Sequence, residues 1–453
     1  MRTYASGASA PKAAGGAVRR RRSCGGLRPP FARKRGNLRS VHRLRLSPPR
    51  RAVAVLVSAF LAFCAAPSLG AEEPGSSLRL SLLTMSPGDQ SFTKFGHDAL
   101  LVEDTATGSA LVYNYGTFVF DSPWLAIDFL RGNLKYWLSV STLPHVIRHY
   151  AAERRAITAQ ELALPPAERW RIADFLARTE RSDTRYYKYD YYRDNCATRV
   201  RDVIDGAVGG RLRAASQAPA PLTYREETLR LTADDTWLSL GLDLAMGPLI
   251  DRPLTVWQSQ FLPARLQAAV RGVLVPAPGG DTPLVTGERV LLPAPGRTLR
   301  ESPPRRWPSL LGAGVASCAV LAGLGLLSQR NGRVARALLA VLVALLGLSF
   351  GVLGTVIVGL FLTDHAVTYF DANVLLATPT SLALPFFALG IGKGRPRALR
   401  RARDLSALSL VTSALVLAAQ PFLTQKNLGF VCFFLPLWLG ATLGLTLAGR
   451  TSS

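Results

Sequence analysis

The sequence predicts an α+β soluble domain followed by an all-α bundle of five transmembrane helices. The apolar residues of the 453-residue chain concentrate in one run near position 55 and in several runs after position 307. Between them lies a segment of ordinary soluble composition, rich in Tyr, Trp, Asp and Arg, in which strand-like and helix-like patterns are mixed. We therefore expect four parts, at residues 1–51, 52–71, 72–306 and 307–453.

The first two parts have the composition of a targeting region. Residues 1–51 carry many Arg and Lys and no acidic residue, and we expect this basic leader to be disordered. Residues 52–71 form an apolar run that ends in small residues. This pattern predicts a signal peptide, with an uncleaved signal anchor as the alternative.

The net charge of +24 follows the pattern of a membrane protein and does not indicate nucleic-acid binding. Outside the leader, most of the positive excess lies in short loops between apolar segments, which is the positive-inside bias. Each segment has close to the 20 or so residues that cross a bilayer. The five predicted spans are Trp307–Ser328, Ala337–Leu362, Val374–Gly392, Leu405–Thr424 and Leu428–Ala448.

The loop charges predict the orientation of these spans. Residues 329–336 and 393–403 are strongly basic and are assigned to the cytoplasm, whereas 363–373 and 425–426 are assigned to the outside. Residues 72–306 are then periplasmic, and the chain is a multi-pass protein of a bacterial inner membrane. The central turns of the spans contain no Asp, Glu, Lys or Arg, which argues against ion-coupled transport. Five helices favour a lateral site for a lipid substrate over a simple anchor.

The soluble segment contains elements of both types in sequence order. Alternating or apolar runs predict strands over 78–83, 95–102, 110–115 and 135–140. Proline starts and apolar spacing predict helices over 123–131, 144–153 and 164–180. The tyrosine-rich stretch 185–193 is expected to be extended, and a further helix is expected from 196 to 208.

Cys196 is the one cysteine of five in the predicted periplasmic segment. An unpaired thiol in an oxidising compartment forms no disulfide within its domain, and we interpret Cys196 as a nucleophile. Asn195 is a suitable N-cap, so Cys196 lies in the first helical turn, where the helix dipole favours a thiolate. Arg193 and Arg199 are expected to add positive charge, and free backbone N–H groups of that turn to stabilise an oxyanion.

A cysteine nucleophile needs a base, and the soluble segment offers His97, His145 and His149. His145 and His149 lie four apart on a helix, but no third ligand accompanies them, so we expect no metal. His97 starts a strand beside Gly96, opposite residues 113–116, and either Asn114 or a flanking tyrosine is expected to share its face. A purely structural histidine is the alternative interpretation.

Several motifs resemble those of the Lnb family of bacterial lipoprotein N-acyltransferases. The order of strand histidine, polar strand residue and Asn-Cys helix start is also similar to circularly permuted papain-type folds, including NlpC-like enzymes. The resemblance therefore implies a permuted papain/NlpC-like periplasmic domain before the five-helix bundle. The motifs that carry it are Phe95-Gly96-His97, residues 112–118, Leu130-Arg131-Gly132, residues 194–202, Trp257 to Pro263 and Thr363-Asp364-His365.

This resemblance implies transfer of a fatty acyl chain from a phospholipid to the α-amino group of a diacylglyceryl-cysteine lipoprotein. Cys196 would form an acyl-thioester with His97 as the base, and Asn114 would orient His97. Asn195 and Tyr113 are candidates for oxyanion or orienting roles. The candidates for substrate or headgroup contacts are Arg199, Asp364 and His365.

Two other functions remain open at this point. A membrane-tethered cysteine peptidase or peptidoglycan amidase would use the same Cys196–His97 pair, and a non-catalytic envelope assembly module would use neither. No metal, nucleotide or flavin motif is visible, so we expect no cofactor. The expected partners are a phospholipid donor, a diacylated lipoprotein and the membrane, without nucleic acid.

Overall fold

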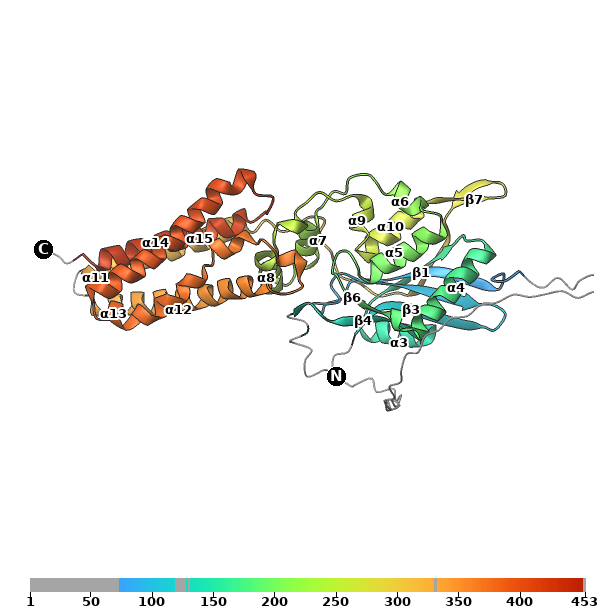
Figure 1. Cartoon of the computed structure of the whole chain (residues 1–453), viewed down its shortest axis with the longest axis horizontal. Helices are drawn as coiled ribbons and strands as arrows, with labels where there is room; N and C mark the ends of the chain where they lie inside the picture. The colour runs from blue at the N-terminus through green and yellow to red at the C-terminus, as the bar shows by residue number, and fades with distance from the viewer. Residues whose placement is uncertain (1–72, 119–127, 129–130, 330–331, 451–453) are drawn as a thin grey trace, which may run out of the picture. The chain divides into compact units, whose positions relative to one another are not determined.

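The computed structural model describes residues 73–118, 128, 131–329 and 332–450. The predicted basic leader (1–51), the predicted signal segment (52–71) and nearly all of the predicted helix 123–131 lie outside these residues. The described chain begins with a sheet and its helices and ends with five apolar helical segments (Figure 1). This confirms the α+β class of the first part and the helical class of the second.

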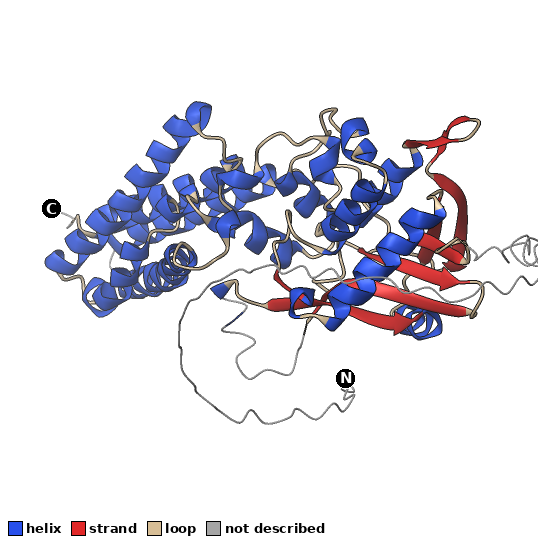
Figure 2. Ribbon diagram, turned by 45° about the vertical axis from the view of Figure 1, so that its right-hand side comes forward, coloured by secondary structure: helices blue, strands red, loops and turns tan. Residues whose placement is uncertain are grey.

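A seven-stranded antiparallel sheet forms the centre of the α+β part, with the order β6-β4-β3-β2-β1-β5-β9 (Figure 2). A separate hairpin joins β7 and β8. The strands are β1 (Leu78–Met85), β2 (His97–Asp104), β3 (Ser109–Thr117), β4 (Lys135–Thr142), β5 (Ile157–Leu162), β6 (Tyr186–Lys188), β7 (Leu274–Ala277), β8 (Gly280–Pro283) and β9 (Val285–Leu292).

Four of the seven strands of the sheet, β1 to β4, were predicted as strands. Strand β6 lies in the stretch that was expected to be extended, and the other two strands of the sheet were not predicted. Strand β2 starts at His97 rather than Phe95 because Gly96 has a φ of 82°, which is outside the strand region. Strands β5 and β9 were missed, and they pair beside β1 on the edge away from β3. The permuted papain-like arrangement stays a prediction.

Helices cover both faces of the sheet because its inner strands are apolar on both sides. On β1, Leu80 and Leu82 join the core beneath α4, α5 and α10, while Leu83 and Met85 join the core beneath α3. The helices of this part are α3 (Leu143–Ala152), α4 (Pro166–Arg181), α5 (Cys196–Ala207), α6 (Arg211–Ala215), α7 (Tyr224–Leu231), α8 (Thr236–Ala245), α9 (Val256–Ser259) and α10 (Pro263–Arg271), with short 3₁₀ turns η1 (Asp183–Arg185) and η2 (Pro248–Ile250).

All five predicted spans correspond to apolar helical segments long enough to cross a membrane. The elements are α11 (Trp307–Gln329), α12 (Arg333–Leu360), η3 (Ala366–Thr368), η4 (Ala372–Leu375), η5 (Pro379–Phe387), α13 (Ala388–Gly392), α14 (Pro396–Ala419), η6 (Gln420–Phe422) and α15 (Leu428–Ala448). The third span is largely 3₁₀ rather than α-helical. Pro379 and Pro385 lack the N–H groups that a regular α-helix would use there. Helix α14 starts nine residues before the predicted Leu405, because its basic first turns are also helical.

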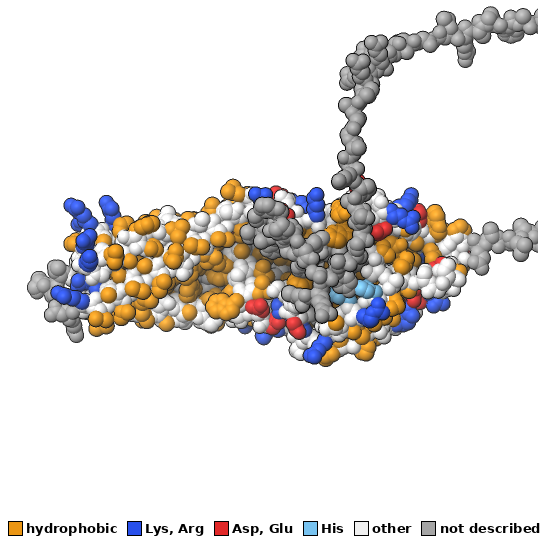
Figure 3. Space-filling view, turned by 90° about the horizontal axis from the view of Figure 1, so that it is seen from below, with side chains coloured by type: hydrophobic (Ala, Val, Ile, Leu, Met, Phe, Trp, Pro, Cys, Tyr) orange, Lys and Arg blue, Asp and Glu red, His pale blue; other side chains and the backbone are white. Residues whose placement is uncertain are grey.

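The surface of the helical part matches its predicted environment. Large apolar side chains are exposed along α11, α12, α14 and α15, as expected for helices that face lipid. Figure 3 shows these hydrophobic side chains over the bundle, with Lys and Arg gathered toward its C-terminal end. The α+β part meets this bundle at its outer loops, where the Gly247 N–H donates to the Val367 carbonyl at 2.8 Å.

Candidate functional site

Cys196 is the first residue of α5 and is 7% exposed. Asn195 is the N-cap, as predicted, and forms a reciprocal capping box with Thr198. The Asn195 side chain accepts from the Thr198 N–H at 2.9 Å, and the Thr198 hydroxyl accepts from the Asn195 N–H at 2.7 Å. This capping box fixes the position of the Cys196 side chain at the helix start.

The side-chain amide of Asn195 is fully used in holding the surrounding loops. Its Nδ2 donates to the carbonyls of Tyr191 and Phe261, each at 2.9 Å. Both amide hydrogens are therefore committed, and the expectation that this amide donates to an oxyanion does not fit the geometry. The backbone N–H groups at the helix start are the remaining candidates.

His97 and Asn114 lie on neighbouring strands and are hydrogen-bonded to each other through Nε2 and Oδ1. The pairing of Leu100 with Tyr113 sets the register that brings the two side chains together. With the Nε2 hydrogen donated to Asn114, Nδ1 of a neutral imidazole is left as an acceptor. The partner of His97 is thus Asn114 rather than a flanking tyrosine.

Gly116 lies between His97 and Cys196. It has a φ of 92° and sits in a bulge of β3 between Asn114 and Thr117. A Cβ atom at this position would be 3.6 Å from Cys196 Cβ and 3.7 Å from His97 Cε1. Cys196 and His97 therefore flank the same backbone position, where the positive φ rather than lack of space favours glycine.

Burial sets the protonation of this pair. It raises the pKa of the Cys196 thiol above its usual value, although the N–H groups of Asp98, Ala197 and Cys196 itself act in the opposite direction. Burial also lowers the pKa of His97, against the opposing effect of the Asn114 hydrogen bond. A neutral thiol and a neutral imidazole result at pH 7. Burial thus opposes the thiolate that the position at the helix start favours.

The two arginines expected to stabilise a thiolate have other surroundings. Arg199 forms a two-point ion pair with Asp194, and its guanidinium lies 4.2 Å from the centre of the Tyr187 ring. Arg193 is exposed and lines a different cavity. Neither side chain compensates for the burial of the thiol, which explains the direction of its pKa.

Asp98 is a buried carboxyl that the sequence analysis did not identify. It is fully buried, accepts a hydrogen bond from Thr84 Oγ1 at 2.9 Å, and its Oδ2 has no hydrogen-bond partner among the described residues. Burial, and secondarily the charge of Cys196, hold the pKa of Asp98 well above its usual range. A neutral Asp98 leaves the thiol free of a competing negative charge.

The Asp98→Asn variant is expected to become more stable relative to wild type as pH rises. A carboxyl whose pKa is raised in the folded state takes up a proton on folding, so its contribution to stability declines as pH rises from the usual pKa toward the raised one. Asparagine does not titrate. The difference in melting temperature, variant minus wild type, is expected to increase between about pH 5 and about pH 8. A constant difference would show that Asp98 is already ionised in the folded protein.

Tyr113 is not among the tyrosines that lie near the thiol. Tyr113 is buried in the core, and the charged neighbours of its hydroxyl are Arg181 and Glu180 at the end of α4. The tyrosines with Cys196 in their electrostatic surroundings are Tyr136, Tyr187 and Tyr189, and burial raises the pKa of each. Tyr187 and Tyr189 belong to the tyrosine-rich run that leads into Cys196, whereas Tyr136 lies in β4.

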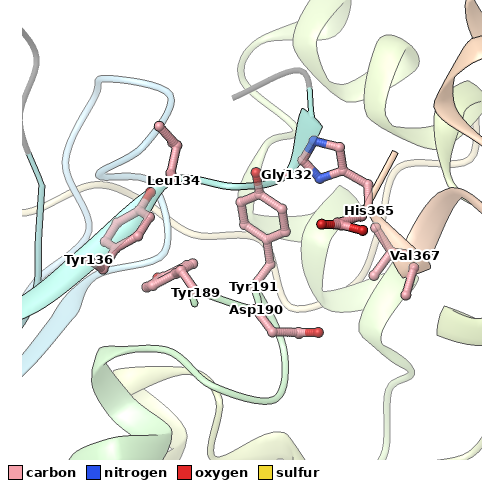
Figure 4. Close-up of a pocket in the computed structure, with 10 residues that line it drawn as sticks. Gly132, Leu134, Tyr136, Tyr189, Asp190, Tyr191, His365 and Val367 are labelled. Carbon is pink, nitrogen blue, oxygen red and sulfur yellow. The ribbon is translucent and has the colours of Figure 1, made fainter. Parts of the chain in front are cut away.

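A row of aromatic rings connects this site to an outer loop of the helical bundle. Tyr136 stacks on Tyr189 at 4.2 Å between ring centres, Tyr189 meets Tyr191 at 5.9 Å, and Tyr191 stacks on His365 at 6.1 Å. A cavity of about 30 Å³ lies among these rings (Figure 4). Its lining residues are Gly132, Leu134, Tyr136, Tyr189, Asp190, Tyr191, Asp364, His365, Ala366 and Val367.

The loop that carries Asp364 and His365 is fixed to the α+β part. The Asp364 carboxylate pairs with Lys188 at 2.8 Å, and its N–H donates to the Arg131 carbonyl at 2.9 Å. A Cβ at Gly132 would lie 3.1 Å from the Asp364 carbonyl carbon, so glycine permits this close approach. Two motifs far apart in the sequence, 130–132 and 363–365, therefore meet beside the aromatic row.

The fold and site define a membrane protein whose α+β domain carries a buried group of Cys, His and Asn side chains. A row of aromatic rings joins this group to an outer loop of the helical bundle. Residues 71–230 match the family described as the Lnb N-terminal periplasmic domain. This match confirms the resemblance of the α+β part to the Lnb family. No curated protein and no solved structure gives a significant match.

Proposed function

We propose that this protein is a lipoprotein N-acyltransferase of the bacterial inner membrane. It moves a fatty acyl chain from a phospholipid, through a thioester on Cys196, to the α-amino group of a diacylglyceryl-cysteine lipoprotein. The observation that carries the proposal is the location of the Cys196–His97–Asn114 constellation, linked by aromatic rings to the outer loop at His365. The Lnb periplasmic domain points to the same lipoprotein-processing role.

The first step is attack of Cys196 on the ester carbonyl of the phospholipid. His97, neutral because burial lowers its pKa, takes the thiol proton as the C–S bond forms. Backbone N–H groups at the start of α5 stabilise the resulting oxyanion. The ester C–O bond then breaks, the lysophospholipid oxygen receives the proton from His97, and the acyl chain stays on sulfur.

The second step transfers the acyl chain to nitrogen. The lipoprotein amine attacks the thioester carbonyl and gives a proton to His97. The C–S bond breaks, the sulfur takes that proton, and an amide and a free thiol are produced. The site favours the amine over water because the thiol is 7% exposed and bordered by tyrosine rings.

Both substrates reach this site from the membrane surface. Their reacting groups lie at the outer face of the inner membrane, and His365 and Asp364 line the cavity beside the aromatic row. We assign these two residues to contacts with a substrate headgroup or backbone. Arg199, whose charge is neutralised by Asp194, is assigned to holding Tyr187 in place.

Trapping of the acyl-enzyme tests the proposed chemistry. The purified protein in phospholipid nanodiscs, without acceptor, is expected to gain the mass of one acyl chain that hydroxylamine removes. Cys196→Ala should gain none, whereas Cys432→Ala, which removes a thiol within a membrane span, should behave as wild type. Absence of the adduct together with cleavage of a peptide or peptidoglycan amide would instead identify a hydrolase.

The Asn114→Ala variant is expected to lose about 10-fold to 100-fold in acyl-transfer rate, because His97 loses the group that orients it. The hydrogen bond that His97 donates to Asn114 opposes the lowering of the His97 pKa, so its loss lowers that pKa further. The acid limb of the pH–rate profile should therefore move to lower pH. A lower rate with an unmoved acid limb would show that Asn114 acts only on folding.

A further inference from the structure

A second and larger cavity lies outside the Cys196 site. It has a volume of about 330 Å³, which is in the range of small-molecule binding sites. Its walls come from the segment before α5, from α5 itself and from the stretch 249–258. Its polar and aromatic lining includes Arg193, Arg201, Tyr224, Arg252, Trp257 and Gln258.

Three arginines give this cavity its charge. Arg201 is largely buried, its guanidinium lies 3.9 Å from the centre of the Trp257 ring, and Nη1 donates to the Trp257 carbonyl at 3.0 Å. Arg193 and Arg252 are exposed, and neither has an ion pair within the described chain. The lining contains no acidic residue, and Asp202, which pairs with Arg201 at 2.8 Å, is 58% exposed in its side chain. The cavity therefore holds an excess of positive charge.

The chemistry of the walls suits an anion with several oxygen acceptors, such as a phosphate. Guanidinium groups bind phosphate oxygens through paired N–H donors, and three of them surround one space. Tyr224 also lines the cavity together with these arginines. The Trp257 ring and the Gln258 side chain complete a wall that combines apolar surface with hydrogen-bonding groups.

Part of the cavity wall follows a contact with an outer loop of the helical bundle. Its residues 249–254 follow Gly247, whose N–H donates to the Val367 carbonyl in an outer loop of the bundle. Large aromatic side chains in the neighbouring α8 and outer loops are strongly exposed: Trp237 (86%), Phe370 (79%) and Phe422 (89%). Exposed aromatic side chains of this kind are typical of the interface between lipid and water. A lipid headgroup can therefore reach the arginines while its acyl chains stay in the bilayer.

We propose that this cavity binds the phosphate of an anionic lipid headgroup through Arg193, Arg201 and Arg252. The site is separate from the acyl-transfer chemistry, since a phosphate would bind there whether or not Cys196 reacts. A soluble phosphate compound carries the same chemistry and is the other source to be tested. Within the proposed function, such a site would hold a phospholipid close to the reacting thiol.

Lipid binding by the full chain in its Cys196→Ala form tests this inference without any acyl transfer. Native mass spectrometry in detergent would count bound phosphatidylglycerol, with diacylglycerol as the lipid without phosphate. We expect phosphatidylglycerol to bind, and Arg193→Ala/Arg252→Ala to weaken that binding at least about 10-fold, because charge-assisted hydrogen bonds are lost. Arg148→Ala/Arg181→Ala removes two exposed arginines outside the cavity and should bind as the parent does.

Equal binding of the two lipids, or equal weakening by both double variants, would overturn the proposal. Inorganic phosphate and glycerophosphate, added at millimolar concentration, distinguish the source. If neither compound displaces the lipid, the result supports a site for a lipid headgroup. If both compounds displace the lipid, and glycerophosphate binds directly as tightly as the lipid does, the cavity is a phosphate site. Its occupant is then not a lipid.

Discussion

The Cys196→Ser variant is expected to transfer acyl chains at least about 1,000-fold more slowly than the wild-type protein. A serine hydroxyl is far harder to deprotonate than a thiol, and the buried His97 has a lowered pKa that makes it a weak base. Replacement of sulfur by oxygen at a small, buried position leaves the capping box of α5 intact. The rate would be measured with purified protein, a phospholipid donor and a synthetic diacylated lipopeptide.

Matched variants separate chemistry from folding in this experiment. Cys318→Ser and Cys432→Ser remove the other two thiols of the described chain, both in membrane spans, and should retain the wild-type rate. The melting temperature of Cys196→Ser should remain near that of wild type. If the Cys196→Ser protein kept more than about a tenth of the rate, the thioester route would be refuted.

The second large effect concerns stability at Arg225, near the outer loops of the bundle. The Arg225 side chain is 1% exposed and pairs with Asp251 at 2.9 Å and with Asp243 at 2.8 Å. It also donates to the carbonyls of Met246 and Gly247. The Asp251 side chain is completely buried, so it has no access to water if its partner is removed.

The Arg225→Met variant is therefore expected to lower the free energy of unfolding by about 3–5 kcal/mol, because it leaves a buried carboxylate unpaired. Melting temperature in detergent and hydrogen exchange of residues 246–252 would report the loss. Arg171→Met removes an exposed ion pair with Glu168 and should change stability by less than about 1 kcal/mol. Equal stability of Arg225→Met and Arg171→Met would contradict the role assigned to Arg225.

Local features of the sequence were sufficient to predict several elements of the structure. The N-cap at Asn195 and the start of α5 depend on residues within four positions of each other, and the spacing shows both. Strands β1 to β4 alternate or run apolar over enough residues to be recognised. The five spans follow from length and hydropathy alone.

Features that depend on distant contacts were not predictable. Strand β9 pairs with β5 across more than a hundred residues, and its pattern is mostly exposed. The hydrogen bond between His97 and Asn114 required a register that no single-sequence pattern fixes. The raised pKa of Cys196 arises from the helices and tyrosines that bury it, whereas its helix position alone favours a thiolate. The 3₁₀ geometry of the third span follows from Pro379 and Pro385, which a hydropathy pattern does not register.

The mass of the N-terminal lipopeptide of a lipoprotein tests the central claim most directly. Cells that lack any other N-acylating enzyme would express either this chain or its Cys196→Ala form. We predict that the lipopeptide gains one acyl chain on its amine with the intact chain and none with the variant. A lipopeptide that stays diacylated with both proteins, when both are present at equal levels in the membrane, would contradict N-acyl transfer by Cys196.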